Sequence, residues 1–211
     1  MVDLHPELMS TLLSTPLTAD PTMAAFGASL TAITLAELGD KTFFMALILA
    51  ARHRGRDVFV GAFGALAAVT LISLGFGYGL RALLPASVVP WLAAVLFLGF
   101  GVKLLVDAQG MGVDEADDEA REAEQTIAEA ESRRRISSAW AVIWEAFVLV
   151  FLAELGDRTQ FTTIFLAAAP GFSFSGLLAG TLLGHALVTW LAVGAGKWIG
   201  GRISERVLYR L

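Results

Sequence analysis

Five apolar stretches, each long enough to cross a lipid bilayer as a helix, dominate this sequence and restrict what it can fold into. A spanning helix needs roughly 20 mostly apolar residues. Of the 211 residues, 56% are hydrophobic and only 17% are charged, whereas a soluble domain carries about a quarter charged residues. The sequence therefore predicts an all-α integral membrane protein that crosses the membrane several times. The five expected spans cover about residues 24–51, 58–80, 88–106, 138–168 and 174–199.

The first and fourth stretches each carry a charged cluster in an otherwise apolar segment. "AELGDKTFFMALILAA" begins at Ala36 and "AELGDRTQFTTIFLAA" begins at Ala153, so the two align without a gap at an offset of 117 residues. The helices that follow align at an offset of 119. The pattern predicts an internal repeat. Three glycine pairs match across it: Gly61 with Gly180, Gly75 with Gly194, and Gly77 with Gly196.

The two repeats are expected to be inverted relative to each other. Three helices per repeat, an odd number, make the first motif helix enter from outside and the second from inside, a plan that recurs in secondary transporters. The second repeat has no counterpart of the third span before the sequence stops at Leu211, so the sixth helix is either lost or removed by truncation. We expect a non-cytoplasmic tail over 1–23, a first repeat over 24–106, an acidic cytoplasmic linker over 107–137, and an incomplete second repeat over 138–211.

Basic residues give the expected orientation, because cytoplasmic loops are enriched in Lys and Arg. All three basic segments fall on one side of the membrane if the N-terminus lies outside. The opposite side then carries only Arg81. The basic segments contain Arg52, Arg54 and Arg56; Arg133, Arg134 and Arg135; and Arg202, Arg206 and Arg210.

The linker holds most of the negative charge. Ten of the twenty acidic residues lie between Asp107 and Glu131. This composition is typical of a solvated helix or a disordered hinge, and the alternative is a regulatory or cation-concentrating arm. No basic face with interleaved aromatic residues is present, so nothing indicates a nucleic-acid partner.

Ionisable side chains inside a membrane are costly, at least roughly 2.5–3.5 kcal/mol each at the centre of the bilayer, and are functional by default. Residues three or four apart share one face of a helix, so Glu37 lies near Asp40 and Glu154 near Asp157. The glycines inside the motifs, Gly39 and Gly156, permit close backbone approach or local unwinding. Such carboxylates, together with nearby hydroxyls, suit a hard cation such as Ca²⁺ or Mn²⁺.

The candidate metal ligands are therefore Glu37, Asp40, Glu154 and Asp157, with Thr42 and Thr159 as hydroxyl donors of oxygen. Lys41 and Arg158 balance part of the charge and leave the cluster at -2, which matches one divalent ion. A thiolate metal site is excluded because cysteine is absent. Protons compete with the cation for the same oxygens, because burial and crowding of like charges favour the neutral carboxyl. The alternative is a pair of intrahelical ion pairs, Glu37–Lys41 and Glu154–Arg158, which only hold helices together.

The motif Glu-x-Gly-Asp-(Lys/Arg)-(Thr/Ser), present here at Glu37–Thr42 and Glu154–Thr159, resembles the signature of the GDT-type Ca²⁺/Mn²⁺:proton exchangers. The resemblance covers about residues 24–206 and implies a multi-pass transporter of the bacterial plasma membrane, chiefly a Mn²⁺ exporter. It also implies that the four motif carboxylates bind the ion. The residue after the Thr is often Gln in that family; Gln160 keeps this pattern and Phe43 does not, which implies an asymmetric site with Gln160 as an extra oxygen ligand.

Two further ionisable residues lie in the expected spans. His185 is in the middle of the fifth span, opposite Leu66 in the repeat alignment. It is a candidate proton relay or ion contact, and a hydrogen-bonded packing histidine is the alternative. Glu145 is a candidate vestibule acid at the cytoplasmic end of the fourth span, or an interfacial acid.

The sequence favours a divalent cation/proton antiporter, and we expect no enzyme. HExxH, P-loop and GxSxG signatures are all absent, so no catalytic residue and no cofactor is assigned. The expected partners are the metal ion, protons and lipid. A homo-oligomer is one way to cover the face left open by the absent sixth helix. The rival functions are a divalent-cation channel with an acidic filter and a non-transporting membrane scaffold.

Overall fold

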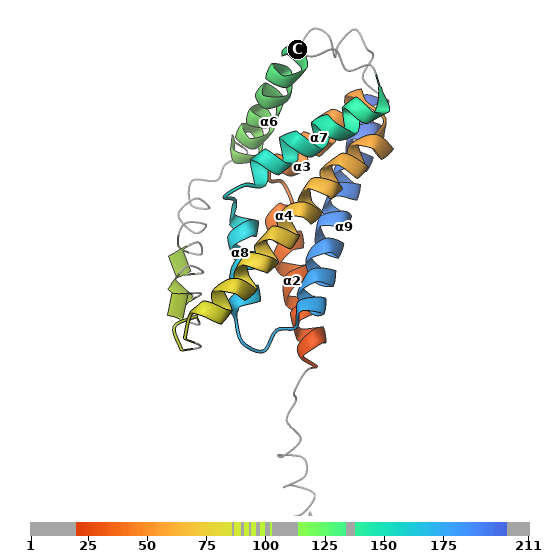
Figure 1. Cartoon of the computed structure of the whole chain (residues 1–211). Helices are drawn as coiled ribbons and strands as arrows, with labels where there is room; N and C mark the ends of the chain where they lie inside the picture. The colour runs from red at the N-terminus through yellow and green to blue at the C-terminus, as the bar shows by residue number, and fades with distance from the viewer. Residues whose placement is uncertain are drawn as a thin grey trace, which may run out of the picture.

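The computed structural model describes residues 20–85, short pieces between 87 and 102, residues 114–133 and residues 138–201. The N-terminal tail up to residue 19, most of the third expected span and the basic tail after residue 201 lie outside this part of the chain. Within it, every regular element is a helix (Figure 1). The helices are α2 (Pro21–Glu37), α3 (Lys41–Arg52), α4 (Gly55–Leu83), α6 (Asp114–Arg133), α7 (Ala139–Glu154), α8 (Arg158–Ala168) and α9 (Phe174–Gly200).

Two of the described helices, α4 and α9, are long and apolar enough to cross a membrane by themselves. The pair α7 and α8 passes the same test as a third span, although it bends by 69° at its break. Helices α2 and α3 have 17 and 12 residues, and together they cover the first expected span. The chain is thus a helical membrane protein. Where the sequence analysis expects one span for each motif, the structure divides that span into two helices.

Both breaks fall inside the charged motifs. Helix α2 ends at Glu37 and α3 begins at Lys41, while α7 ends at Glu154 and α8 begins at Arg158. Gly39 and Gly156 lie between them with φ of 78° and 87°, a left-handed conformation that glycine adopts without a steric penalty. The expectation that Glu37 and Asp40 share a face of one helix is therefore wrong, and local unwinding is the role that the motif glycines take.

The long helices pack on the broken ones in a crossed arrangement. Helix α4 lies against α7 and α8, and α9 lies against α2 and α3. Figure 1 shows α2 and α3 running up the view while α7 and α8 run down it.

Glycines provide the closest of these approaches. At four glycines the helix backbone comes so close to another helix that a side chain would collide with a backbone oxygen. For Gly61 and Gly77 of α4 these are the oxygens of Ile143 and Ile164. For Gly180 and Gly196 of α9 they are the oxygens of Phe26 and Leu47. Ile143 and Ile164 lie 117 positions after Phe26 and Leu47. Glycines matched in the sequence alignment therefore meet matched backbone positions on the other half of the chain.

The acidic linker contributes an ordered helix that packs against α3. Helix α6 buries Ala123 and Ile127 completely among the core residues of α3 and its neighbours. Two ion pairs flank this contact, Lys41–Glu122 at 3.1 Å and Arg52–Glu124 at 3.5 Å. Such half-exposed pairs each contribute about 1 kcal/mol or less, whereas burying an isoleucine contributes about 1.5–3 kcal/mol. The two apolar side chains therefore hold α6 in place more than the ion pairs do.

A methyl group at Gly77 is expected to destabilise the crossed packing. In Gly77→Ala the new Cβ would meet the backbone oxygen of Ile164 and the side chain of Ala167, whereas the Cβ of Gly75→Ala would meet nothing within 4 Å. Overpacking of this kind costs about 1–3 kcal/mol. Thermal unfolding in detergent should therefore show a lower midpoint for Gly77→Ala and an unchanged or higher one for Gly75→Ala, because alanine favours a helix more than glycine does. Equal midpoints for the two variants would contradict the close approach of α4 and α8.

Replacing Ile127 with a charged residue should release α6 from α3. Ile127→Asp places a carboxylate in a fully buried position, while Ala128→Asp changes an exposed one. Limited trypsin digestion should then cut after Arg121 at least about tenfold faster in Ile127→Asp, since protection reflects the free energy of local opening. Similar cleavage rates in the two variants would show that α6 does not depend on this contact.

Candidate cation-binding site

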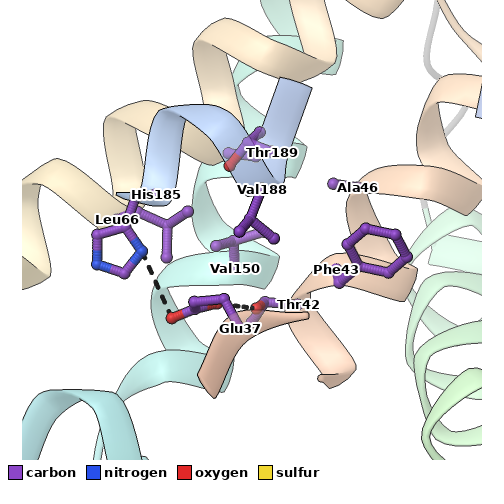
Figure 2. A pocket seen from close by; sticks show the side chains of 10 residues that line it. Glu37, Thr42, Phe43, Ala46, Leu66, Val150, His185, Val188 and Thr189 are labelled. Atoms are coloured by element: carbon purple, nitrogen blue, oxygen red, sulfur yellow. Dashed lines mark hydrogen bonds and ion pairs between the residues drawn. The ribbon is translucent and has the colours of Figure 1, made fainter. Parts of the chain in front are cut away.

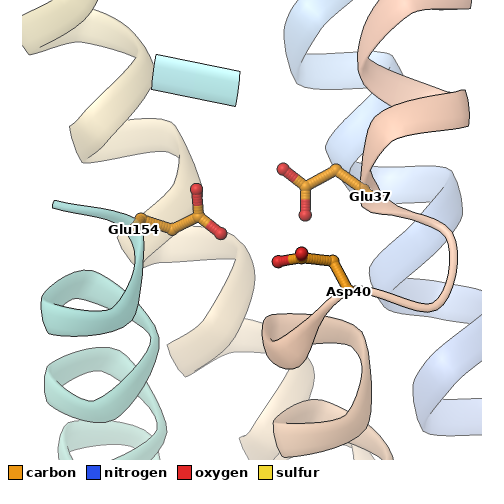
Figure 3. Close-up of side chains that lie close together, drawn as sticks. All are labelled: Glu37, Asp40 and Glu154. Atoms are coloured by element: carbon orange, nitrogen blue, oxygen red, sulfur yellow. The ribbon is translucent and has the colours of Figure 1, made fainter. Parts of the chain in front are cut away.

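Three carboxylates from the two breaks converge on one point. Glu37 is the last residue of α2, Asp40 precedes α3, and Glu154 is the last residue of α7. Each offers one oxygen, and these oxygens all lie within 4.8 Å of one another. All three residues are buried, with exposed fractions of 2%, 8% and 1%. Figure 3 shows the three carboxylate groups pointing toward one another.

The two glutamates are held in the same way. Thr42 Oγ1 donates a hydrogen bond to Glu37 Oε2 at 3.1 Å, and Thr159 Oγ1 donates one to Glu154 Oε2 at 3.0 Å. The remaining oxygen, Oε1, is buried in both residues and has no hydrogen-bond partner within the described residues. An unpaired buried carboxylate oxygen is costly. A cation seated between Glu37 and Glu154 would remove that cost.

The two motif aspartates differ. Asp40 Oδ1 accepts a hydrogen bond from Arg158 Nη2 at 2.9 Å, so it pairs with the basic residue of the other motif. Asp157 Oδ2 instead accepts from Thr159 N at 3.1 Å and caps the start of α8. Asp157 does not belong to the converging group of three. Its ligand role stays a prediction.

The other oxygen donors predicted from the sequence lie at the site but are engaged locally. Gln160 Oε1 accepts from Gly156 N at 2.7 Å and so closes the second break. The hydroxyls of Thr42 and Thr159 donate hydrogen bonds to the glutamates, and their oxygen lone pairs remain available as acceptors. The structure gives Thr42, Thr159 and Gln160 an orienting role. Direct metal ligation by them stays a prediction.

The basic residues do not form the intrahelical ion pairs considered for a scaffold. Arg158 pairs with Asp40 across the two motifs, and Lys41 pairs with Glu122 on α6. The pairs Glu37–Lys41 and Glu154–Arg158 are absent from the described part of the chain, because the breaks turn the basic residues away from their own glutamates. The three converging carboxylates outnumber Arg158, the basic residue paired with them, so the group is net negative and suits a cation.

Two small pockets flank the glutamates. The first adjoins Glu37 and has a volume of about 10 Å³, about that of one water-sized sphere. The second adjoins Glu154. His185 and Leu66 line both pockets. Figure 2 shows His185 beside Glu37 in the first one, with His185 Nδ1 3.4 Å from Glu37 Oε1.

Thr70 and Thr189 were not assigned to the site from the sequence, although they are matched positions of the repeat. Both are buried, and Thr70 lines the second pocket while Thr189 lines the first. The signal in the sequence that could have indicated them is a threonine at the same aligned position of two apolar helices, α4 and α9. Glu145 is half-buried on α7, nine positions before Glu154, and is not part of the converging carboxylates.

Helix α6 brings further negative charge to the edge of the site. Partial burial of Glu119, followed by the negative charges of Asp40 and Glu122, raises the pKa of the Glu119 carboxyl above its ordinary value. Arg158 and Lys41 oppose this pKa shift. Glu119 therefore lies within electrostatic reach of both motifs.

The fold and the site define a class: a helical membrane protein with broken helices and a buried, net negative cluster of carboxylates suited to a cation. A model of the family described as the divalent cation/proton antiporter GDT1 matches residues 25–112 and 142–211. The chain belongs to this family, as the two motifs predicted.

Known relatives agree with that assignment. GDT1-like protein sll0615 of Synechocystis sp. is 43% identical over 187 residues, which cover 88% of this chain and 89% of that protein. GDT1-like protein 1, chloroplastic, of Oryza sativa subsp. indica is 40% identical over 194 residues, covering 87% of this chain and 56% of the relative. Protein PAM71, chloroplastic, of Arabidopsis thaliana is 40% identical over 198 residues, which cover 88% of this chain and 52% of that protein. The chain thus spans about half the length of these plant relatives. No solved structure matches it.

Removing either buried glutamate charge should weaken cation binding. Glu37→Gln and Glu154→Gln each delete one of three converging carboxylates, whereas Glu124→Gln alters a half-exposed residue of α6. We expect the Kd for Mn²⁺ or Ca²⁺, measured by calorimetry in detergent, to rise at least about tenfold in the first two variants. The Kd of Glu124→Gln should stay near that of the wild type. An unchanged Kd in Glu37→Gln would exclude this cluster as the binding site.

Proposed function

We propose that this chain exchanges a divalent cation, Mn²⁺ or Ca²⁺, for protons, and that in a bacterial plasma membrane it chiefly exports Mn²⁺. The observation that carries the proposal is the convergence of Glu37, Asp40 and Glu154, with an unpaired buried oxygen on each glutamate. Oxygen donors in this number and charge suit hard divalent ions. Membership of a divalent cation/proton antiporter family supports the same activity.

Exchange follows from competition for the same oxygens. A carboxylate that holds a cation cannot hold a proton, and a buried carboxylate without a cation gains by taking one up. One site that carries either the metal ion or protons therefore couples their movements in opposite directions. The metal ion is cargo in this scheme, and we assign the chain no cofactor and no enzymatic step.

Alternating access needs two halves that move against each other. We propose that the chain is built from inverted repeats, with the cation between the two broken helices. The crossed contacts of Gly61 and Gly77 with α7 and α8, and of Gly180 and Gly196 with α2 and α3, support this arrangement. Broken helices that meet around a site are the recurrent device of transporters with inverted repeats. The basic segments favour an N-terminus on the outside.

Flux through purified protein in proteoliposomes tests the proposal. Vesicles that carry a pH gradient and equal Mn²⁺ or Ca²⁺ concentrations on both sides should accumulate the cation against its own gradient while protons flow the other way. Asp40→Asn should abolish both fluxes, because it removes one of the three carboxylates and the partner of Arg158. Glu124→Gln is the matched control and should transport normally.

The same assay separates the rival functions. A channel with an acidic filter would let the cation run only down its own gradient, with no dependence on the proton gradient. A scaffold would give no flux in the wild type. Cation movement that never exceeds equilibrium, in vesicles shown to hold a stable pH gradient, would exclude the antiporter.

A further inference from the structure

We propose that His185 Nδ1 is a direct ligand of the transported ion, and that this nitrogen makes the site select first-row transition ions such as Mn²⁺ over Ca²⁺. The inference rests on the proposed function, since it requires the cation to sit between the two motif glutamates. It adds the residue that determines which divalent ion the site prefers.

The geometry of His185 and Glu37 suits two ligands of one ion. His185 lies in α9 with an exposed fraction of 4%, and its Nδ1 is 3.4 Å from Glu37 Oε1. Both atoms are buried and lack a hydrogen-bond partner within the described residues. Two donors at about 2.1 Å from one ion, at right angles, lie about 3.0 Å apart. A small movement would therefore let a single cation contact the imidazole and the carboxylate together.

His185 also lines a pocket on the side of each glutamate, one next to Glu37 and one next to Glu154. The imidazole is therefore next to Glu37 and reaches both pockets, although it lies outside the converging group of three carboxylates. A histidine that served packing alone would be expected to have its ring nitrogens hydrogen-bonded, as buried polar groups almost always are.

The other half of the chain shows that this place does not need a histidine for packing. Leu66 is the residue aligned with His185 in the first half, and it lines the same two pockets from α4. An apolar side chain thus fills the matched position. The imidazole adds one donor atom on one side of the carboxylate group and makes the site asymmetric.

A nitrogen donor changes which ions bind well. Ca²⁺ is bound almost entirely by oxygen ligands, whereas imidazole is a common ligand of first-row transition ions. Because Mn²⁺ is the weakest binder in that series, Fe²⁺ and Zn²⁺ should bind at least as tightly. With three carboxylates alone the site would hold Ca²⁺ and Mn²⁺ comparably. With His185 it favours Mn²⁺.

Pulsed electron paramagnetic resonance on the full chain with Mn²⁺ alone tests the ligand directly, because a coordinated imidazole gives ¹⁴N modulation of the bound Mn²⁺ signal. The chain has three histidines, His5, His53 and His185. The double variant His5→Gln/His53→Gln leaves only His185 and should keep the ¹⁴N modulation. His185→Leu, which copies the matched Leu66, and His185→Gln should lose it.

Calorimetry on the same samples tests the selectivity. We expect His185→Leu to weaken Mn²⁺ binding about tenfold or more and to change Ca²⁺ binding less than about twofold. Bound Mn²⁺ without ¹⁴N modulation in the double variant would overturn the proposal and leave the antiporter intact. Equal loss of Mn²⁺ and Ca²⁺ affinity in His185→Leu would also overturn it, since that pattern indicates packing. A wild type that binds neither ion would overturn both this inference and the proposed function.

Discussion

The organisation of this protein depends on three carboxylates that are buried next to one another. Glu37, Asp40 and Glu154 can be close together only if something compensates their repulsion and their loss of hydration. Part of that compensation is visible: Arg158 donates to Asp40, and the hydroxyls of Thr42 and Thr159 donate to the two glutamates. The remainder is left to a cation or to protons. A buried group of carboxylates with this net charge favours a bound positive charge.

The breaks in the motif helices follow from the same requirement. A continuous helix would point Glu37, Asp40 and Lys41 in directions fixed by its own pitch. Unwinding at Gly39 and Gly156 ends one helix at each glutamate and starts the next at each basic residue. The C-terminal end of α2 or α7 carries a partial negative charge, which favours a bound cation. The two glycines therefore allow the helix breaks that place the carboxylates next to one another.

Much of this arrangement could be predicted from the sequence, because its signals are local or repeated. The two motifs and the matched glycine pairs were visible in the alignment, whereas local unwinding was one of two roles that the sequence left open for the motif glycines. The Asp40–Arg158 pair was not visible in the alignment, because it joins residues of different halves and depends on how the breaks turn. The different contacts of the two aspartates could not be predicted either: Asp157 caps its own helix, whereas the matched Asp40 pairs with Arg158 of the other motif.

The packing of α6 on α3 is a third example. Among the α6 side chains that the structure describes, Ala123 and Ile127 are the fully buried ones. Two small apolar contacts in a strongly acidic segment give too weak a pattern to predict a tertiary contact. The position of Thr70 and Thr189 at the pockets was not predicted either. Threonines in apolar helices often donate their hydroxyl hydrogen to a backbone oxygen of the same helix. Thr70 does so to Leu66 O, so a matched pair of threonines does not by itself indicate a site.

The crossed contacts have a consequence for how the protein is made. Helix α4 ends at Leu83, but α7 and α8, which pack against its glycines, begin only at Ala139. While the intervening linker is being synthesised, the surface of α4 around Gly61 and Gly77 has no protein neighbour from the second half. Insertion and assembly are therefore separate events for this chain. The first half, which carries the motif acids Glu37 and Asp40, is therefore synthesised before α7 and α8 can pack against it.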